Sequence, residues 1–558
     1  MTTNKRRDLL KAGAAAIATT PAIFGGAMLP RLAQAQVNFT RGMITAENEP
    51  PSPPVPKFTQ AVYIPPAATP VNPASLTPSI NPARHQRYAE YPAVKHYVQD
   101  MREGYWNYHP ALSALNSAGG SLAWMFNNAA PGETFVAKYG EPFFIRRTNN
   151  LPLAQNTKIP FGYPATTTHL HNSHSASESD GYPMDFIEPG QFWDHHHPMI
   201  YARNDPNEAL ASLWYHDHMI DFTATNVYAG LSGMCIFYDH IDSGNENDQN
   251  AGALRLPGGY GKYDLYFILH DVRFNQQGHP TFNIFNTDGF LGDVITVNRK
   301  AFPYFKVERR KYRLRFLDGG PSRFYELRFQ DKSKFFVISN DGNLLETPVE
   351  ASTVVLGVAN RHDIIVDFSK YAPGTSIVLE NVMEQTNGQG PTGKQLEQGM
   401  PVMRFDVIDS NVVDNSKVPD FLRKLPSINL SEVVAERDWV FDHDMGLWTV
   451  NGQFMDPTIT SASVRQGTAE IWNFRNAGTS WSHPVHVHFE EFQVIEWNGR
   501  PPTGVLKSRK DVATLGPGDT AKVFYRFSDF LGKYPIHCHN NVHEDNAMML
   551  RWDIVPNV

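Results

Sequence analysis

The sequence predicts an all-β protein built from three β-sandwich domains with Greek-key connections. The chain has 558 residues, of which 41% are hydrophobic, and this is enough apolar material for several cores. Its 40 glycines and 41 prolines indicate many turns between short strands. Short apolar stretches recur at the spacing typical of sandwiches, and no long segment with a 3.6-residue period competes with them.

Residues 1–35 have the pattern of a twin-arginine export signal. Residues 5–7 are Lys-Arg-Arg, a weakly apolar run covers residues 12–29, and small residues up to Ala35 provide a cleavage site. A membrane anchor is the alternative, but glycine, threonine and proline interrupt the run. We therefore expect cleavage, no stable insertion in a membrane, and export to the periplasm or the extracellular space.

Residues 36–82 are interpreted as a Pro-rich arm that leads into the first domain. Proline, alanine, threonine and serine dominate its second part, as in EPPSPPVPKF and IPPAATPVNPASLTP. This composition favours an extended segment that runs over a surface rather than a core element.

The first domain is expected over residues 83–245, where FVAKYG, EPFFIRRTNN and GLSGMCIFYD read as strands. Residues 93–102 are the exception and are interpreted as a short helix or a loop. The second domain, over 260–410, contains YDLYFILHDVRF and KYRLRFLD. In the latter stretch Tyr312 and Leu314 alternate with Arg313 and Arg315, which predicts a strand with one face in solvent. The third domain covers 430–558 and includes TAEIWNF, HPVHVHF, AKVFYRF and YPIHCH.

The composition excludes several classes of function. Forty-nine basic against 57 acidic residues give a net charge of −8, so a chain-wide positive field for nucleic acid is absent. Two cysteines permit at most one disulfide, which excludes a disulfide scaffold. The 22 histidines are unusual, because histidine is the commonest transition-metal ligand and is seldom needed for packing.

Eight of these histidines form four pairs with one residue between the partners. A strand repeats every two residues, so each pair presents both imidazoles on one face. A single pair is usually an ordinary polar face, but four pairs, divided between the first and third domains, predict a metal site. The pairs are His169 and His171, His216 and His218, His486 and His488, and His537 and His539.

Cys538 lies between the two histidines of the last pair and would face the other way along a strand. Its thiolate can bind one metal while its neighbours bind others, so that the backbone becomes a short electron conduit. Two histidines, one cysteine and an axial methionine form the ligand set of a blue-copper centre. His483, His543 and Met548 supply the other members of this set. Zinc is the competing metal, but structural cysteine sites normally use two or more thiolates, and packing beside Met549 is the alternative for Met548.

Taken together, HLH, WYHDH, HPVHVH and HCHNNVHEDNAMM resemble the multicopper oxidases of the bacterial laccase, spore-coat laccase and bilirubin oxidase group. The stretches NVYAGLSGMCIFYD and GFLGDVITVN strengthen the resemblance, which covers essentially the whole chain after the arm. It implies cupredoxin-like sandwiches and four copper ions, one of type 1, one of type 2 and two of type 3.

The resemblance also implies which residues bind each ion. Type 1 copper would be bound by His483, Cys538 and His543, with Met548 axial. Type 2 copper would be bound by His169 and His486. The type 3 pair would take His171, His216 and His539 on one ion and His218, His488 and His537 on the other.

Three further positions are compared with the family pattern. Asn172 stands where the family usually has glycine, which puts the local turn in doubt but not the ligands. Asp180 and Glu544 match acidic positions that the family uses near the copper cluster, and we expect them to donate or relay protons. A turn-stabilising aspartate and a surface glutamate are the alternatives.

The function implied is one-electron oxidation of phenols or aromatic amines coupled to four-electron reduction of O2 to water. The alternatives are a cuprous or manganese oxidase in metal tolerance and a copper-free assembly protein on the same scaffold. The loop 384–400 lacks the methionine-rich insert of the former, and the chain has lost none of the ligands that the latter usually lacks. The natural reductant and the oligomeric state are left open.

Other candidates are assigned no chemistry. The tract His195-His196-His197 is expected in a solvated or locally hydrogen-bonded loop, and His174 is unassigned. Cys235 is expected to be a buried free thiol. Trp214 and Tyr215 are expected to pack the wall of the metal site.

Overall fold

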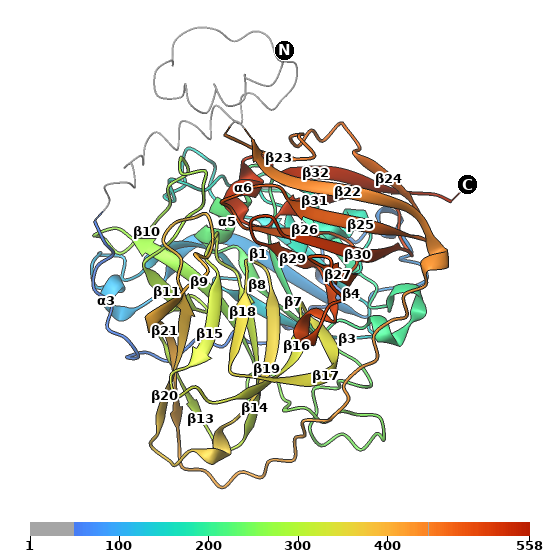
Figure 1. Cartoon of the computed structure of the whole chain (residues 1–558). Coiled ribbons are helices and arrows are strands. Elements are labelled where there is room, and N and C mark those ends of the chain that lie inside the picture. The colour runs from blue at the N-terminus through green and yellow to red at the C-terminus, as the bar shows by residue number, and fades with distance from the viewer. Residues whose placement is uncertain (1–49, 445, 558) are drawn as a thin grey trace.

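The computed structural model describes residues 50–444 and 446–557, so the expected export signal and the start of the arm lie outside the described residues. Most regular structure is strand, and the six sheets form three pairs along the chain (Figure 1). The predicted all-β class is confirmed. Within the described ranges, no helix has both the length and the apolar character needed to span a bilayer.

The first sandwich pairs two four-stranded sheets. Ring centroids of Tyr97 and Phe135, one from each sheet, lie 5.1 Å apart, so the apolar faces meet in one core. One sheet has the order β2 (Ser121–Phe126), β1 (Lys95–Trp106), β4 (Phe143–Asn149), β6 (Phe192–His197). The other has the order β3 (Gly132–Lys138), β8 (Ser232–Tyr238), β7 (Ser212–Asp217), β5 (Thr168–Leu170).

The second sandwich has the larger sheets, and Phe267 and Phe405 meet across its core with ring centroids 6.4 Å apart. Its first sheet runs β12 (Lys300–Ala301), β11 (Val294–Val297), β9 (Asp264–Phe274), β14 (Lys311–Asp318), β19 (Arg361–Asp367), β16 (Phe335–Asn340), β17 (Asn343–Ala351), with β10 (Pro280–Thr281) paired to β9. Its second sheet runs β13 (Tyr304–Val307), β21 (Gln395–Val407), β20 (Ser376–Met383), β15 (Tyr325–Phe329), β18 (Thr353–Leu356).

The third sandwich, orange to red in Figure 1, is closed by a cluster of aromatic rings in which Trp472 and Trp552 lie 5.4 Å apart. One sheet runs β23 (Leu447–Val450), β22 (Val433–Asp444), β25 (Thr468–Asn476), β30 (Thr520–Phe527), β27 (Phe492–Trp497), β28 (Arg509–Lys510). The other runs β24 (Ala462–Arg465), β32 (Met549–Val555), β31 (Gly532–Cys538), β26 (His483–Val487), β29 (Val512–Leu515).

Helices in the described residues are short and connect strands. Two of them, α5 and α6, lie side by side, and the backbone N–H of Ala224 in α5 donates to Asp545 of α6 over 3.0 Å (Figure 1). The α-helices are α3 (Pro110–Ser113), α4 (Ser177–Asp180), α5 (Thr223–Ala229) and α6 (Asn541–Asp545). The 3-10 turns are η2 (Pro73–Ser75), η3 (Pro82–Arg84), η4 (Ala202–Asn204), η5 (Pro206–Glu208), η6 (Phe368–Lys370), η7 (Leu430–Glu432) and η8 (Gly504–Leu506).

Two expectations about strands are wrong. Residues 93–102 form most of β1 rather than a helix or loop, because β1 pairs in parallel with β4 and antiparallel with β2. Tyr97, Gln99 and Met101 alternate on the buried face of β1, but this alternation alone is too weak to predict a strand without knowledge of β2 and β4. The second concerns Arg313 and Arg315, which are fully buried instead of solvated. The first sandwich covers this face, and Arg315 donates to Ser212 over 2.7 Å.

The described part of the arm runs along the second and first sandwiches. The N–H of Val62 donates to the carbonyl of Tyr304 over 2.8 Å, and that of Ala68 donates to Thr134 over the same distance. Beyond the arm, Arg87 reaches Asp529 of the third sandwich at 2.9 Å. The segment therefore ties the sandwiches together along their surface.

Candidate metal centres

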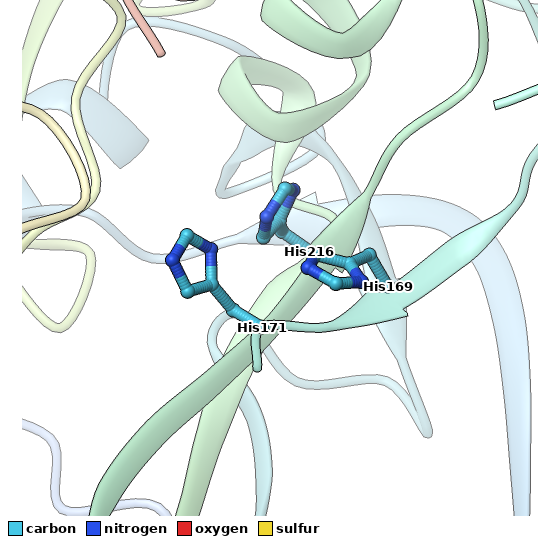
Figure 2. A group of neighbouring side chains, drawn as sticks. All are labelled: His169, His171 and His216. Carbon is cyan, nitrogen blue, oxygen red and sulfur yellow. The ribbon is translucent and has the colours of Figure 1, made fainter. Parts of the chain in front are cut away.

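Two strands of the first sandwich and two of the third bring the four histidine pairs together. His169 lies opposite His216 where β5 pairs with β7, and His486 lies opposite His537 where β26 pairs with β31. Alternation along each strand then places the second histidine of each pair on the same side. Figure 2 shows His169, His171 and His216 with their rings gathered beside β5 and β7.

The eight imidazoles form one compact group, called here the histidine cluster. His169 stacks on His488 and His171 stacks on His486, each with ring centroids 3.8 Å apart. His539 lies 5.3 Å from His216 in the same group. All eight side chains are fully buried. The structure thus brings together every histidine that the sequence assigned to the type 2 and type 3 ions.

The ring nitrogens of different histidines lie close enough to one another to bind the same metal ion. The Nε2 atom of His488 lies 2.9 Å from Nε2 of His218 and 3.3 Å from Nε2 of His537. Ligand atoms of these three residues, and of His169 with His171 and His216, fall within 4.8 Å of one another. Burial and the neighbouring His537 lower the pKa of His486 well below its usual value, so this ring is neutral and can offer a lone pair.

Hydrogen bonds behind the rings orient several of them. The Nδ1 atoms of His216 and His486 lie 2.8 Å from the carbonyl oxygens of Asp217 and Asp511, and His169 makes the same kind of contact with the carbonyl of Asp180. With Nδ1–H donating outward, the Nε2 lone pairs face the cluster, and these Nε2 atoms have no protein partner. This is the outer-shell arrangement expected of metal-binding histidines, so the residues fit copper.

Two buried carboxylates, both expected from the sequence, contact histidines of the cluster. Asp180 Oδ2 lies 2.7 Å from Nδ1 of His488. The two oxygens of Glu544 lie 3.0 Å from Nδ1 of His218 and 3.0 Å from Nδ1 of His537. Burial raises the pKa of Asp180, whereas the two histidines outweigh the effect of burial and lower the pKa of Glu544.

Next to the histidine cluster lies the thiolate group, formed by Cys538, His483 and His543. Cys538 Sγ is 3.4 Å from Nδ1 of His483 and 3.6 Å from Nδ1 of His543. Met548 is buried in the same apolar cluster, and its carbonyl accepts the N–H of Cys538 over 3.0 Å. Two nitrogens and a thiol sulfur in a dry, preformed pocket suit copper.

Three participants escaped the sequence reasoning. Asp511 Oδ1 lies 3.2 Å from Nε2 of His171, although 340 residues separate them. Trp448 stacks on His543 with ring centroids 3.7 Å apart. The ring of half-buried His443 lies 4.1 Å from that of Trp448, tilted by 40°. Neither the spacing nor the strand pattern of the sequence marks these residues, because each joins the site only through tertiary packing.

The minor candidates have mixed outcomes. The expectation of a loop at 195–197 is wrong. These residues form the end of β6 and are buried against Phe143 and its neighbours. Trp214 does pack the site wall, 4.1 Å from the ring of His216. Cys235 is confirmed as a buried free thiol. Asn172 adopts the left-handed backbone that glycine favours, with a φ of 55°, which asparagine tolerates.

Comparisons with known proteins agree with this geometry. Residues 111–241 and 429–558 match two family models, each described as multicopper oxidase. A bilirubin oxidase from Albifimbria verrucaria is 33% identical over 511 residues, covering 89% of this chain and 81% of that protein. A laccase from Bacillus subtilis (strain 168) is 30% identical over 487 residues, covering 77% and 90%.

A solved structure shares the fold. The laccase from Pediococcus acidilactici superposes with a TM-score of 0.72 at 23% identity, covering 90% of this chain and 95% of that one. The buried histidines, the thiolate group and the relatives lead to one conclusion. The chain belongs to the multicopper oxidase family, a family of copper oxidoreductases that use oxygen.

Proposed function

We propose that this protein is a laccase-like oxidase that takes single electrons from phenols or aromatic amines and uses them to reduce O2 to water. One observation carries the proposal: Cys538 of the thiolate group lies in the chain directly between His537 and His539 of the histidine cluster. A reductant can be oxidised at the thiolate group while O2 is reduced at the histidine cluster. The covalent bonds between neighbouring residues of the chain connect the two groups.

We further propose four copper ions at the positions assigned from the sequence. His483, Cys538, His543 and Met548 would hold the type 1 copper, and the histidine cluster would hold the other three ions. Copper bound there would supply the one-electron acceptance and the oxygen reduction. The chain supplies fully buried imidazoles and a thiol, which exclude bulk water from these positions.

Asp180 and Glu544 are proposed to serve the proton side of the reaction. Four-electron reduction of O2 consumes protons, and no solvent reaches the buried cluster directly. Each carboxylate touches the outer nitrogen of at least one cluster histidine. These contacts also orient the rings. Asp180, whose pKa burial raises, can hold a proton beside them, whereas Glu544, whose pKa the two histidines lower, would pass protons on from its ionised form.

Export through the twin-arginine route and a periplasmic or extracellular location remain part of the proposal. They rest on the residues before Ala35 in the sequence. An Arg6→Lys, Arg7→Lys double variant tests the export route and the location. The molecular mass and the location of the expressed variant are compared with those of the unchanged chain.

The decisive experiment measures copper content, visible absorption and EPR on the purified protein, with Cys538→Ser as the matched variant. We expect about four coppers per chain, a strong visible band that the variant loses, and a more than hundredfold drop in its phenol-dependent O2 consumption, roughly the upper range for lost copper-site interactions. O2 consumption is then compared among phenols, bilirubin, Mn(II) and Cu(I). A copper-free protein would favour the assembly role, and a preference for Cu(I) or Mn(II) would favour metal tolerance.

A further inference from the structure

An arginine without a carboxylate partner lies inside the first sandwich. Arg147 belongs to β4, and its side chain is fully buried between the two sheets. The chain buries other arginines completely, but Arg310, Arg313, Arg315 and Arg361 each pair with a carboxylate. Arg299 donates to two backbone carbonyls and His270. Arg147 has neither kind of compensation.

The polar contacts of Arg147 leave most of its donors unused. Its Nε donates to Gln99 Oε1 over 3.0 Å, and its guanidinium carbon lies over the ring of Tyr215, 5.4 Å from the centroid. Both terminal nitrogens lack any protein acceptor among the described residues. The Tyr215 hydroxyl accepts from Gln99 and donates to the Glu133 carbonyl, so its own proton is already engaged.

No negative group faces the guanidinium from the surrounding strands. β6 contributes His195 and His197, and burial with the nearby Arg147 lowers the pKa of each well below its usual value, so both are neutral. Burial raises the pKa of Cys235 on β8, so this thiol is neutral as well, and the Tyr215 hydroxyl on β7 donates its proton to the Glu133 carbonyl. Among the described residues, the ring of Tyr215 is therefore the one group that stabilises the charge of Arg147, and no carboxylate neutralises it.

A lone charge in a sandwich core is costly, and so is each buried donor without an acceptor. Water would satisfy the N–H groups but would leave the charge. We propose that Arg147 forms a binding site for one small monovalent anion of the halide class, which accepts hydrogen bonds from both terminal NH2 groups. The single positive charge among neutral neighbours selects a monovalent anion, and the close-packed interior selects a small one.

The anion would join the two sheets behind the metal centre. Arg147 and Gln99 belong to one sheet and Tyr215 to the other, where it directly precedes His216 of the histidine cluster. Bound halide would fix this hydrogen-bonded chain and so stabilise β7. The site is independent of copper and of the proposed oxidase activity.

Crystallography tests the site directly. The copper-loaded protein is expressed, purified and crystallised with bromide replacing chloride, and diffraction is measured at the bromine absorption edge. We expect an anomalous peak within hydrogen-bonding distance of both terminal nitrogens of Arg147. Ordered water there without anomalous signal, or bromide as an adventitious ion on the surface only, overturns the proposal.

Thermal unfolding supplies an independent readout with a matched control. In wild type, raising bromide about a hundredfold at constant ionic strength, with gluconate as the balancing anion, should raise Tm by a few degrees. Arg147→Met should abolish this shift. Arg146→Met should keep it, because Arg146 is the adjacent residue on β4 and is paired with Asp194 at 2.7 Å. If Arg147→Met does not fold, the wild-type titration decides: a Tm independent of bromide contradicts a halide site.

Discussion

Hydrogen bonds at their outer nitrogens orient several of the cluster imidazoles, and Glu544 contacts two of these rings. Its two oxygens reach His218 and His537, which belong to the first and third sandwiches. A carboxylate that accepts from both rings holds their Nε2 atoms toward the cluster centre and adds negative charge beside it.

Glu544→Gln keeps the shape of this side chain but removes the charge and one acceptor. We expect the affinity for the cluster copper to fall about 10- to 100-fold, the usual effect of losing an outer-shell partner. Copper retention during dialysis against a graded chelator series measures it. Glu436→Gln, a change on an exposed residue, is the control and should bind like wild type. Equal retention in both variants would show that Glu544 does not support the ligands.

His174 makes the contact between the first and third sandwiches dependent on pH. It is buried, and its nitrogens lie 3.4 Å from Glu490 and 3.1 Å from Asp529. Burial lowers the pKa of His174, but the two carboxylates outweigh it and raise the pKa overall. Burial raises the pKa of Glu490 to about 7, so Asp529 is the partner that stays ionised in acid.

A raised histidine pKa contributes stability below the pKa of the unfolded chain, and this is lost as pH rises through the folded value. His174→Gln should therefore lower the free energy of unfolding at pH 5.5 by about 1–3 kcal/mol, the range for a hydrogen bond to a charged group. The difference should shrink by pH 9. Urea unfolding at both pH values measures it, and a deficit that does not change with pH would argue against the charged pair.

At the scale of elements, the hairpin β22–β23 covers the thiolate group. Trp448 stacks on His543 with an interplanar angle of 20°, and half-buried His443 packs against Trp448 at an angle of 40°. His543 itself is fully buried, and its Nε2 lies 3.0 Å from the carbonyl of Asp288. The π system of Trp448 is thus the contact between this ligand and the outer part of the hairpin.

We expect Trp448→Leu to slow phenol oxidation at saturating substrate, because an aliphatic side chain couples the hairpin to His543 less well. Trp448→Phe, which keeps a ring, should recover much of the rate. Copper content and the visible band are measured in parallel and should stay close to wild type in the Phe variant. Equal rates for the Leu and Phe variants would exclude a role for the ring.

At the scale of the whole molecule, the histidine cluster depends on all three sandwiches. The first and third supply the ligands, and the second supplies Arg361, whose Nη1 lies 2.6 Å from Asp511 Oδ1. Asp511 in turn contacts His171 of the first sandwich. The three residues are fully buried where the sandwiches meet.

Removing Arg361 would leave Asp511 buried without its cation. Arg361→Ala should lower the free energy of unfolding by about 3–5 kcal/mol and reduce copper retention. Arg404→Ala breaks a partly exposed pair with Asp406 and should cost only about 0–1 kcal/mol. Denaturant unfolding of both variants gives the comparison, and similar losses for the two would contradict the role of Arg361 at the junction.

The sequence alone determined the features that depend on local periodicity. Alternation along strands placed each pair of histidines on one face, and Cys538 on the other, before any tertiary contact was known. Strand class and the candidate ligands follow from this, and the structure gathers those histidines as expected.

Only the tertiary structure decided which polar groups are buried and what they contact. Neighbouring strands and sheets explain three such features: the strand at 95–106, the burial of the 195–197 tract and the burial of Arg313. Asp511 and Arg361 meet across 150 residues of chain. Periodicity reports only the faces of one strand, whereas the electrostatic partner of a buried group comes from whichever distant segment packs against that face.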